Sequence, residues 1–112
     1  MVNKLEKYTS IVKEILRQTA QYQPANVDVE TQLVFDDATH NYQLMYIGWD
    51  RSGRMLATVI HIRLVNDKAW IEYDGTEEGV ANALLEAGIP KEDIVLAFHP
   101  EWKRKHTGFA VA

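Results

Sequence analysis

The sequence predicts a single α+β domain over residues 1–112: an N-terminal helix, a four-stranded antiparallel meander, a second helix and a packed C-terminal segment. Three observations predict this class. Apolar side chains recur at three- and four-residue steps near the start of the chain, which is typical of a helix packed on one side. From residue 27 the spacing changes to two, which is typical of strands. Short turns separate the alternating runs, so neighbouring strands should be antiparallel.

The first helix is expected over residues 3–22. Asn3 can cap its start, and Glu6 stands at the spacing of a capping box. Pro24 should end the helix, because a proline forces the preceding residue toward extended geometry. The apolar stripe consists of Leu5, Tyr8, Val12, Ile15, Thr19 and Tyr22, and it is widened by Ile11 and Leu16.

The second strand of the predicted meander is apolar on both faces, with Tyr42 and Leu44 on one side and Ile47 and Trp49 on the other. Two helices can cover only one face of such a sheet. The other face should therefore be exposed, and exposed apolar patches mark contact sites, so we expect a homo-oligomer. The strands are predicted over residues 27–35, 42–49, 55–65 and 69–73, with turns at 36–41, 50–53 and 66–68.

The second helix is expected over residues 77–87, with Thr76 as its N-cap. Glu77 and Glu78 would then lie in its first turn, where acidic side chains interact favourably with the helix dipole. Gly88 should end it in the left-handed conformation. A short helical turn at residues 91–93 and a fully buried strand at residues 94–98 should follow.

The charge is distributed unevenly along the chain, whose net charge is −4. Residues 26–101 hold fourteen acids against five bases, a balance of −9. Residues 1–25 hold four bases and two acids, and residues 102–112 hold three bases and no acid, a balance of +5 for the two ends. Nucleic-acid-binding domains are usually basic throughout, so this pattern argues against a general nucleic-acid surface. It suits a charge-complementary contact, between subunits or with a basic partner, and it equally suits a chance distribution of charges over solvated faces.

Several classes of protein are excluded or disfavoured by composition. The chain has no cysteine, so disulfides and thiolate metal sites are excluded. No apolar run approaches the ~20 residues of a membrane span. The first residues do not resemble a secretion signal, so we expect a cytoplasmic protein without a membrane partner.

The candidate chemical groups do not form a recognisable reaction centre. His61 should be a hydrogen-bonded sheet residue and His40 a solvated turn residue, whereas His99 and His106 could approach one another. Serines lack a nucleophile motif and glycines lack a phosphate-binding one. We therefore predict no enzyme, no cofactor and no metal; a small-ligand or metal-dependent activity using His61, His99 and nearby acids is the third alternative. Four acids could surround a cation, although helix capping explains them as well: Glu72, Asp74, Glu77 and Glu78.

The C-terminal segment, residues 102–112, combines a basic run with an apolar end, whereas a frayed terminus is usually small and polar. It should therefore be packed against the domain or a partner. Its bases and aromatic ring could contact nucleic-acid phosphates and stack on a base, or they could meet protein acids. The candidate contact residues are Trp102, Lys103, Arg104, Lys105 and His106.

The sequence resembles the XisI family, the fdxN element excision controlling factors of cyanobacteria, nearly from end to end. The more specific strings are GIPKEDIV from Gly88 to Val95 and KHTGFAVA from Lys105 to Ala112. Further resembling strings are YQP at 22–24, YQLMYIGWD at 42–50, HIR at 61–63 and DGTE at 74–77.

This resemblance implies an accessory role in site-specific excision of a DNA element, beside a recombinase and a companion XisH protein, with no catalytic residues. XisH-type proteins are similar to restriction endonucleases, so an acidic companion is expected to bind or neutralise such a protein. We therefore predict a non-enzymatic regulatory factor that contacts an XisH-like protein through its acidic middle or its C-terminal segment. Direct DNA binding through Lys103, Arg104 and Lys105 is the alternative.

Overall fold

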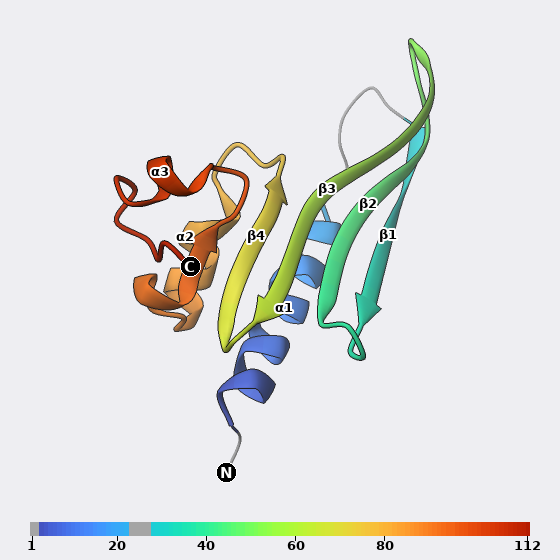
Figure 1. Cartoon of the computed structure of the whole chain (residues 1–112). Helices are drawn as coiled ribbons and strands as arrows, with labels where there is room; N and C mark the ends of the chain where they lie inside the picture. The colour runs from blue at the N-terminus through green and yellow to red at the C-terminus, as the bar shows by residue number, and fades with distance from the viewer. Residues whose placement is uncertain (1–2, 23–27) are drawn as a thin grey trace.

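The computed structural model describes residues 3–22 and 28–112, and Pro24 lies outside them. The chain has an α+β fold, in which one long helix precedes four successive strands and a second helix separates these from the fifth strand (Figure 1). The elements are α1 (Lys4–Ala20), β1 (Asp28–Asp36), β2 (Asn41–Asp50), β3 (Gly53–Val65), β4 (Lys68–Asp74), α2 (Val80–Ala87), the 3-10 turn η1 (Lys91–Asp93), β5 (Ile94–Leu96) and α3 (Glu101–Arg104).

Helix α1 confirms the predicted cap and most of the apolar stripe, although Tyr22 lies beyond its end and is 67% exposed. The backbone N–H of Glu6 donates a hydrogen bond to Asn3 Oδ1 at 2.8 Å, which satisfies one of the unpaired donors at the helix start. The helix ends at Ala20, two residues before the predicted end. Its side chains buried against the sheet are Tyr8, Val12, Ile15 and Leu16.

The sheet has five strands in the order β1-β2-β3-β4-β5, so the predicted four-stranded meander is only part of it. The four predicted strands are antiparallel, and their bounds differ from the prediction by two residues or fewer. Strand β5 pairs in parallel with β4, with Ala69 opposite Ile94. A parallel neighbour needs a crossover connection, and α2 lies within that connection.

The predicted C-terminal strand is shorter than expected and is not fully buried. It ends at Leu96, and Phe98 beyond it is 46% exposed. Ile94 and Val95 are buried, as predicted. The backbone turns away after the strand, which leads the chain into α3 rather than along the sheet.

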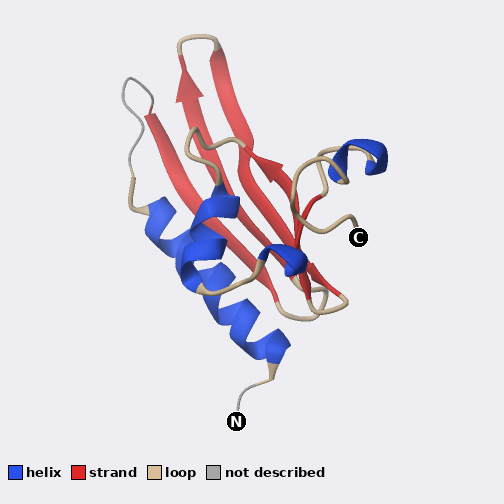
Figure 2. Cartoon of the chain, turned by 90° about the vertical axis from the view of Figure 1, so that its left-hand side faces the viewer, coloured by secondary structure: helices blue, strands red, loops and turns tan. Residues whose placement is uncertain are grey.

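Helices α1 and α2 both pack on one face of the sheet (Figure 2). The hydrophobic core lies between these helices and the inward-facing side chains of β2, β3 and β4. It includes Tyr42, Leu44, Ile60, Ile62 and Ile71 from the strands, and Leu16 and Leu84 from the helices. Two helices on one face agree with the sequence expectation.

The start of α2 differs from the prediction. The helix begins at Val80, three residues later than expected, and Asp74 rather than Thr76 satisfies its first N–H group. Asp74 Oδ2 accepts from the N–H of Val80 at 2.6 Å, and Asp74 Oδ1 accepts from the N–H of Thr76 at 2.9 Å. Gly79 allows this geometry, because its φ of 84° suits a residue without a side chain.

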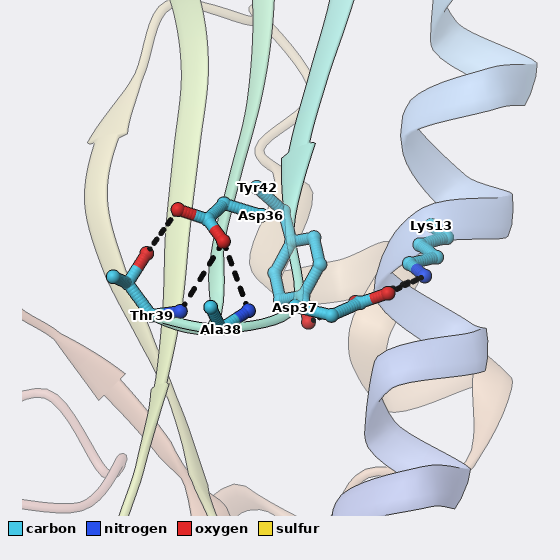
Figure 3. Close-up of polar contacts among 6 residues, drawn as sticks. All are labelled: Lys13, Asp36, Asp37, Ala38, Thr39 and Tyr42. Carbon is cyan, nitrogen blue, oxygen red and sulfur yellow. Dashed lines mark hydrogen bonds and ion pairs between the residues drawn. The ribbon is translucent and has the colours of Figure 1, made fainter.

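The β1–β2 turn is fastened to α1 by a polar network (Figure 3). Lys13 forms an ion pair with Asp37 at 3.0 Å, and the hydroxyl of Tyr42 donates to Asp37 at 2.8 Å. Burial and this hydrogen bond raise the pKa of Tyr42 to about 12. Asp36 holds the turn itself by accepting from the N–H of Ala38 and from the hydroxyl of Thr39.

Within the described residues, no helix is long and apolar enough to cross a membrane.

Candidate functional site

The C-terminal segment is ordered and packed, as its apolar end predicted. It leaves β5 through α3, and α3 lies on the side of the sheet opposite α1 and α2 (Figure 2). The N–H of Ala110 donates to the carbonyl of Ile94 at 2.9 Å, and Ala110 forms a parallel bridge with Val95. Phe109 packs against the core. The segment therefore adds a short extension to the β5 edge.

Arg104 fixes this segment to the sheet. Its Nε donates to the carbonyl of His99 at 2.9 Å and its Nη1 donates to the carbonyl of Val111 at 2.8 Å. The guanidinium carbon lies 5.5 Å from the ring centre of Trp70, within the range of a cation–π contact. Of the three adjacent bases, Arg104 therefore serves the packing of the chain itself.

The neighbours of Arg104 face outward. We call Trp102, Lys103, Lys105 and His106 the exposed tip. All four are exposed, and Trp102 has 66% of its surface accessible. In the described part of the chain, neither Lys103 nor Lys105 forms an ion pair. The tip thus presents an aromatic ring and two lysines to the solvent.

A second accessible surface is the open sheet face, which we define as the outward-facing side chains of β1, β2 and β3. Figure 1 views this face, with α1 behind it. Its most exposed apolar residues are Trp49 at 56% and Leu56 at 66%. The guanidinium of Arg54 lies 5.4 Å from the Trp49 ring centre. The predicted bare face therefore exists, although α3 and the C-terminal segment occupy its β4 side.

The histidines do not converge on the acids. His61 Nε2 lies 2.8 Å from Asn41 Oδ1, as expected of a hydrogen-bonded sheet histidine, and partial burial lowers the pKa of His61. His40 is in the predicted turn but half-buried rather than solvated. His99 lies against the adjacent Phe98 ring at 4.5 Å.

The four acids near the second helix have separate structural roles. Glu72 accepts from Arg63 Nε at 3.0 Å and Asp74 caps α2, while Glu77 and Glu78 are exposed. In residues 3–22 and 28–112, no group of three or more His, Asp or Glu side chains is placed to hold a metal ion.

A cavity of about 640 Å³ opens between α1, the β2–β3 pair and the loop before α2. Its wall is mainly apolar and includes Ile15, Tyr46 and Val59, together with Glu77 and Glu78 from the loop. Of the described histidines, none lines it.

The fold and these surfaces define a small α+β protein with an exposed aromatic and basic tip and an open, partly apolar sheet face. Comparison with protein families matches residues 2–111 to the family described as "XisI protein". The chain belongs to the XisI family.

Two solved structures, both from Anabaena variabilis ATCC 29413, share the fold. One is described as fdxN element excision controlling factor XisI; it is 32% identical, with a TM-score of 0.84, and the alignment covers 98% of this chain and 100% of that one. The other is described as a XisI-like protein; it is 36% identical, with a TM-score of 0.89, covering 96% and 99%. Comparison with curated proteins gives no match.

Proposed function

We propose that this chain is a non-catalytic accessory factor that controls site-specific excision of a DNA element through contacts with a companion XisH-like protein in the cytoplasm. The excision role is supported by family membership, since a relative with the same fold is described as an fdxN element excision controlling factor. The exposed tip is the observation that carries the contact: Trp102 is 66% accessible between a packed helix turn and two lysines without ion pairs among the described residues.

The tip suits a protein partner for physical reasons. Large aromatic side chains are enriched where proteins bind one another, and they contribute much of the binding energy when a partner buries them. Lys103 and Lys105 would steer the tip toward an acidic surface. Arg104 pre-organises the segment that carries the tip, so less ordering entropy is lost on binding.

Co-purification with an XisH-like protein tests this contact. We expect the wild-type pair to elute together in size exclusion at micromolar concentration. Trp102→Ala should weaken the complex by at least about tenfold, the loss of about 1.4 kcal/mol. Lys103→Glu combined with Lys105→Glu should slow association, most strongly at low salt.

The matched control reverses two exposed charges elsewhere, with Lys7→Glu and Arg51→Glu, and it should leave the complex intact. Separate elution of the two wild-type proteins at micromolar concentration would contradict the proposal. Equal affinity of the Trp102→Ala variant and the wild type would remove the tip from the interface.

Direct DNA binding is the second candidate, because the same tip places a tryptophan beside two exposed lysines, which is suited to stacking on a base and neutralising phosphates. It predicts a mobility shift that weakens with salt and is lost in Lys103→Glu with Lys105→Glu. Arg104 is left unchanged in this test, because its replacement would release the segment. Absence of a shift at low salt would exclude DNA binding.

A further inference from the structure

The open sheet face carries its charges in two separate columns. Strand register places one side chain from each of β1, β2 and β3 in a cross-strand row. The five rows are Asp28–Trp49–Arg54, Glu30–Ile47–Leu56, Gln32–Met45–Thr58, Val34–Gln43–His61 and Asp36–Asn41–Arg63. A bulge in β3 near Val59 adds one residue between the third and fourth rows, so that Thr58 and His61 both lie on this face.

Each column has a distinct chemistry. The β1 column is acidic, with Asp28, Glu30 and Asp36, and it is exposed at all three positions. The β3 column is basic at its two ends, with Arg54 and Arg63. The β2 column between them is apolar from Met45 through Ile47 to Trp49, and Leu56 widens it on the β3 side.

The free part of this face has a boundary. Arg104 covers Trp70 on β4. Helix α3 and the segment after it therefore lie on the open side of the sheet, next to β4 and beyond β3. A molecule docking on the face therefore rests on β1, β2 and β3.

We propose that this face binds the same face of a second copy of the chain, with the two-fold axis running parallel to β2. This axis places β2 over β2 of the second copy and β1 over β3, row upon row. Asp28 of each copy then faces Arg54 of the other, and Trp49 and Leu56 are buried between the sheets. The inference is independent of the XisH-like partner.

The charge columns select this axis over the other two-fold arrangement in the plane of the face. An axis perpendicular to the strands would place β1 over β1, with Asp28 facing Asp36 of the second copy. Like charges facing each other at an interface are costly and suppress the wrong docking mode. Sheets packed face to face keep their strand directions within about 30° of each other, which either axis permits, so the charges decide.

Charge exchange tests the geometry, because both partners of the contact lie in one sequence. Sedimentation over roughly 1–500 μM should show wild-type self-association, in the range of weak protein contacts. Asp28→Arg or Arg54→Asp alone should weaken it by about tenfold or more. The double variant carries both changes, so opposite charges face each other again, and its dissociation constant should return toward that of the wild type.

Two further variants separate the interface from effects on folding. Trp49→Lys should abolish self-association while circular dichroism stays native, because each lysine would face the same lysine of the other copy at the axis and the side chain is already exposed in one copy. Glu86→Arg on α2 reverses an exposed charge on the helical side and should change nothing. A wild type that stays monomeric at 500 μM, or a Trp49→Lys variant that still associates, would overturn the proposal. A double variant as weak as the singles would overturn the axis.

Discussion

The hydroxyl of Tyr8 on α1 donates a hydrogen bond to the carboxylate of Asp93, a residue 85 positions later in the chain. Lys4 forms an ion pair with the same carboxylate at 3.0 Å. Asp93 is only 6% exposed, so these two residues satisfy a buried charge that would otherwise be costly. The contact fastens the first helix to the turn that leads into β5.

This contact predicts a stability change at low pH. Burial alone would raise the pKa of Asp93, but the hydrogen bonds from Tyr8 and Lys4 outweigh it and lower that pKa. A carboxyl with a lowered folded-state pKa stabilises the fold above its unfolded pKa of ~3.9, and this contribution is lost as the pH falls through the folded value.

We expect Asp93→Asn to reduce the free energy of unfolding by about 1–3 kcal/mol at pH 7. The difference from the wild type should begin to shrink below about pH 4, where the carboxyl of the unfolded chain becomes protonated, and it should shrink further as the pH falls through the lowered folded-state pKa. Urea unfolding between pH 3 and pH 7 measures it. A difference that is the same at pH 3 and pH 7 would show that the charge of Asp93 does not stabilise the fold.

We expect replacement of Arg104 to loosen the C-terminal segment locally. Arg104→Ala removes two hydrogen bonds and the contact with Trp70, so it should reduce the free energy of unfolding by about 1–2 kcal/mol. Hydrogen exchange at the Ala110 amide should accelerate, because its bond to Ile94 depends on the segment staying in place. Lys103→Ala is the matched control and should change stability by less than about 0.5 kcal/mol.

We expect the hydrogen bonds that Asp74 accepts before α2 to stabilise the start of that helix. Asp74→Ala should cost about 1–2 kcal/mol, since its carboxylate accepts from the N–H groups of both Thr76 and Val80. Thr76→Ala should cost less, because its hydroxyl makes only the 3.2 Å contact with the Gly79 N–H beyond its bond to Asp74. Thermal unfolding of both variants compares them, and a larger loss for Thr76→Ala would reverse this assignment.

The absence of a side chain at Gly48 allows the backbones of β1 and β2 to approach closely. A Cβ atom at this position would lie 2.1 Å from the carbonyl oxygen of Asp28 and 2.8 Å from the Cα of Val29. Gly48→Ala should therefore push β1 outward and cost about 1–3 kcal/mol, measured by urea unfolding. Ala57→Ser at an exposed β3 position is the control. Wild-type stability in Gly48→Ala would show that β1 moves freely.

The periodic elements were predictable from the sequence because burial of one face imposes a repeat. The stripe of α1 and the alternation of β2 both express which side chains meet the core. The parallel pairing of β5 was not predictable in this way. A short apolar run such as Ile94–Leu96 shows that a strand is buried, but nothing in it specifies which neighbour it pairs with.

The remaining differences arise where neighbouring residues have the same local chemistry. Asp74 and Thr76 can both cap a helix, and the choice depends on the turn that Gly79 permits. Lys103 and Arg104 are adjacent bases, and only the position of Trp70 in the folded sheet assigns Arg104 to packing. Sequence reasoning therefore located the C-terminal segment but could not divide its bases between structure and contact.

The bridge between Val95 and Ala110 has a consequence for aggregation. A strand at the edge of a sheet presents unpaired N–H and C=O groups on which another chain can add a strand. The last residues of the chain cover this edge at β5. At the other edge, the carboxylates of Asp28, Glu30 and Asp36 on β1 would repel β1 of a second copy. Loss of the final few residues would thus leave one unprotected edge at β5, on which the same edge of a second copy could add its strand.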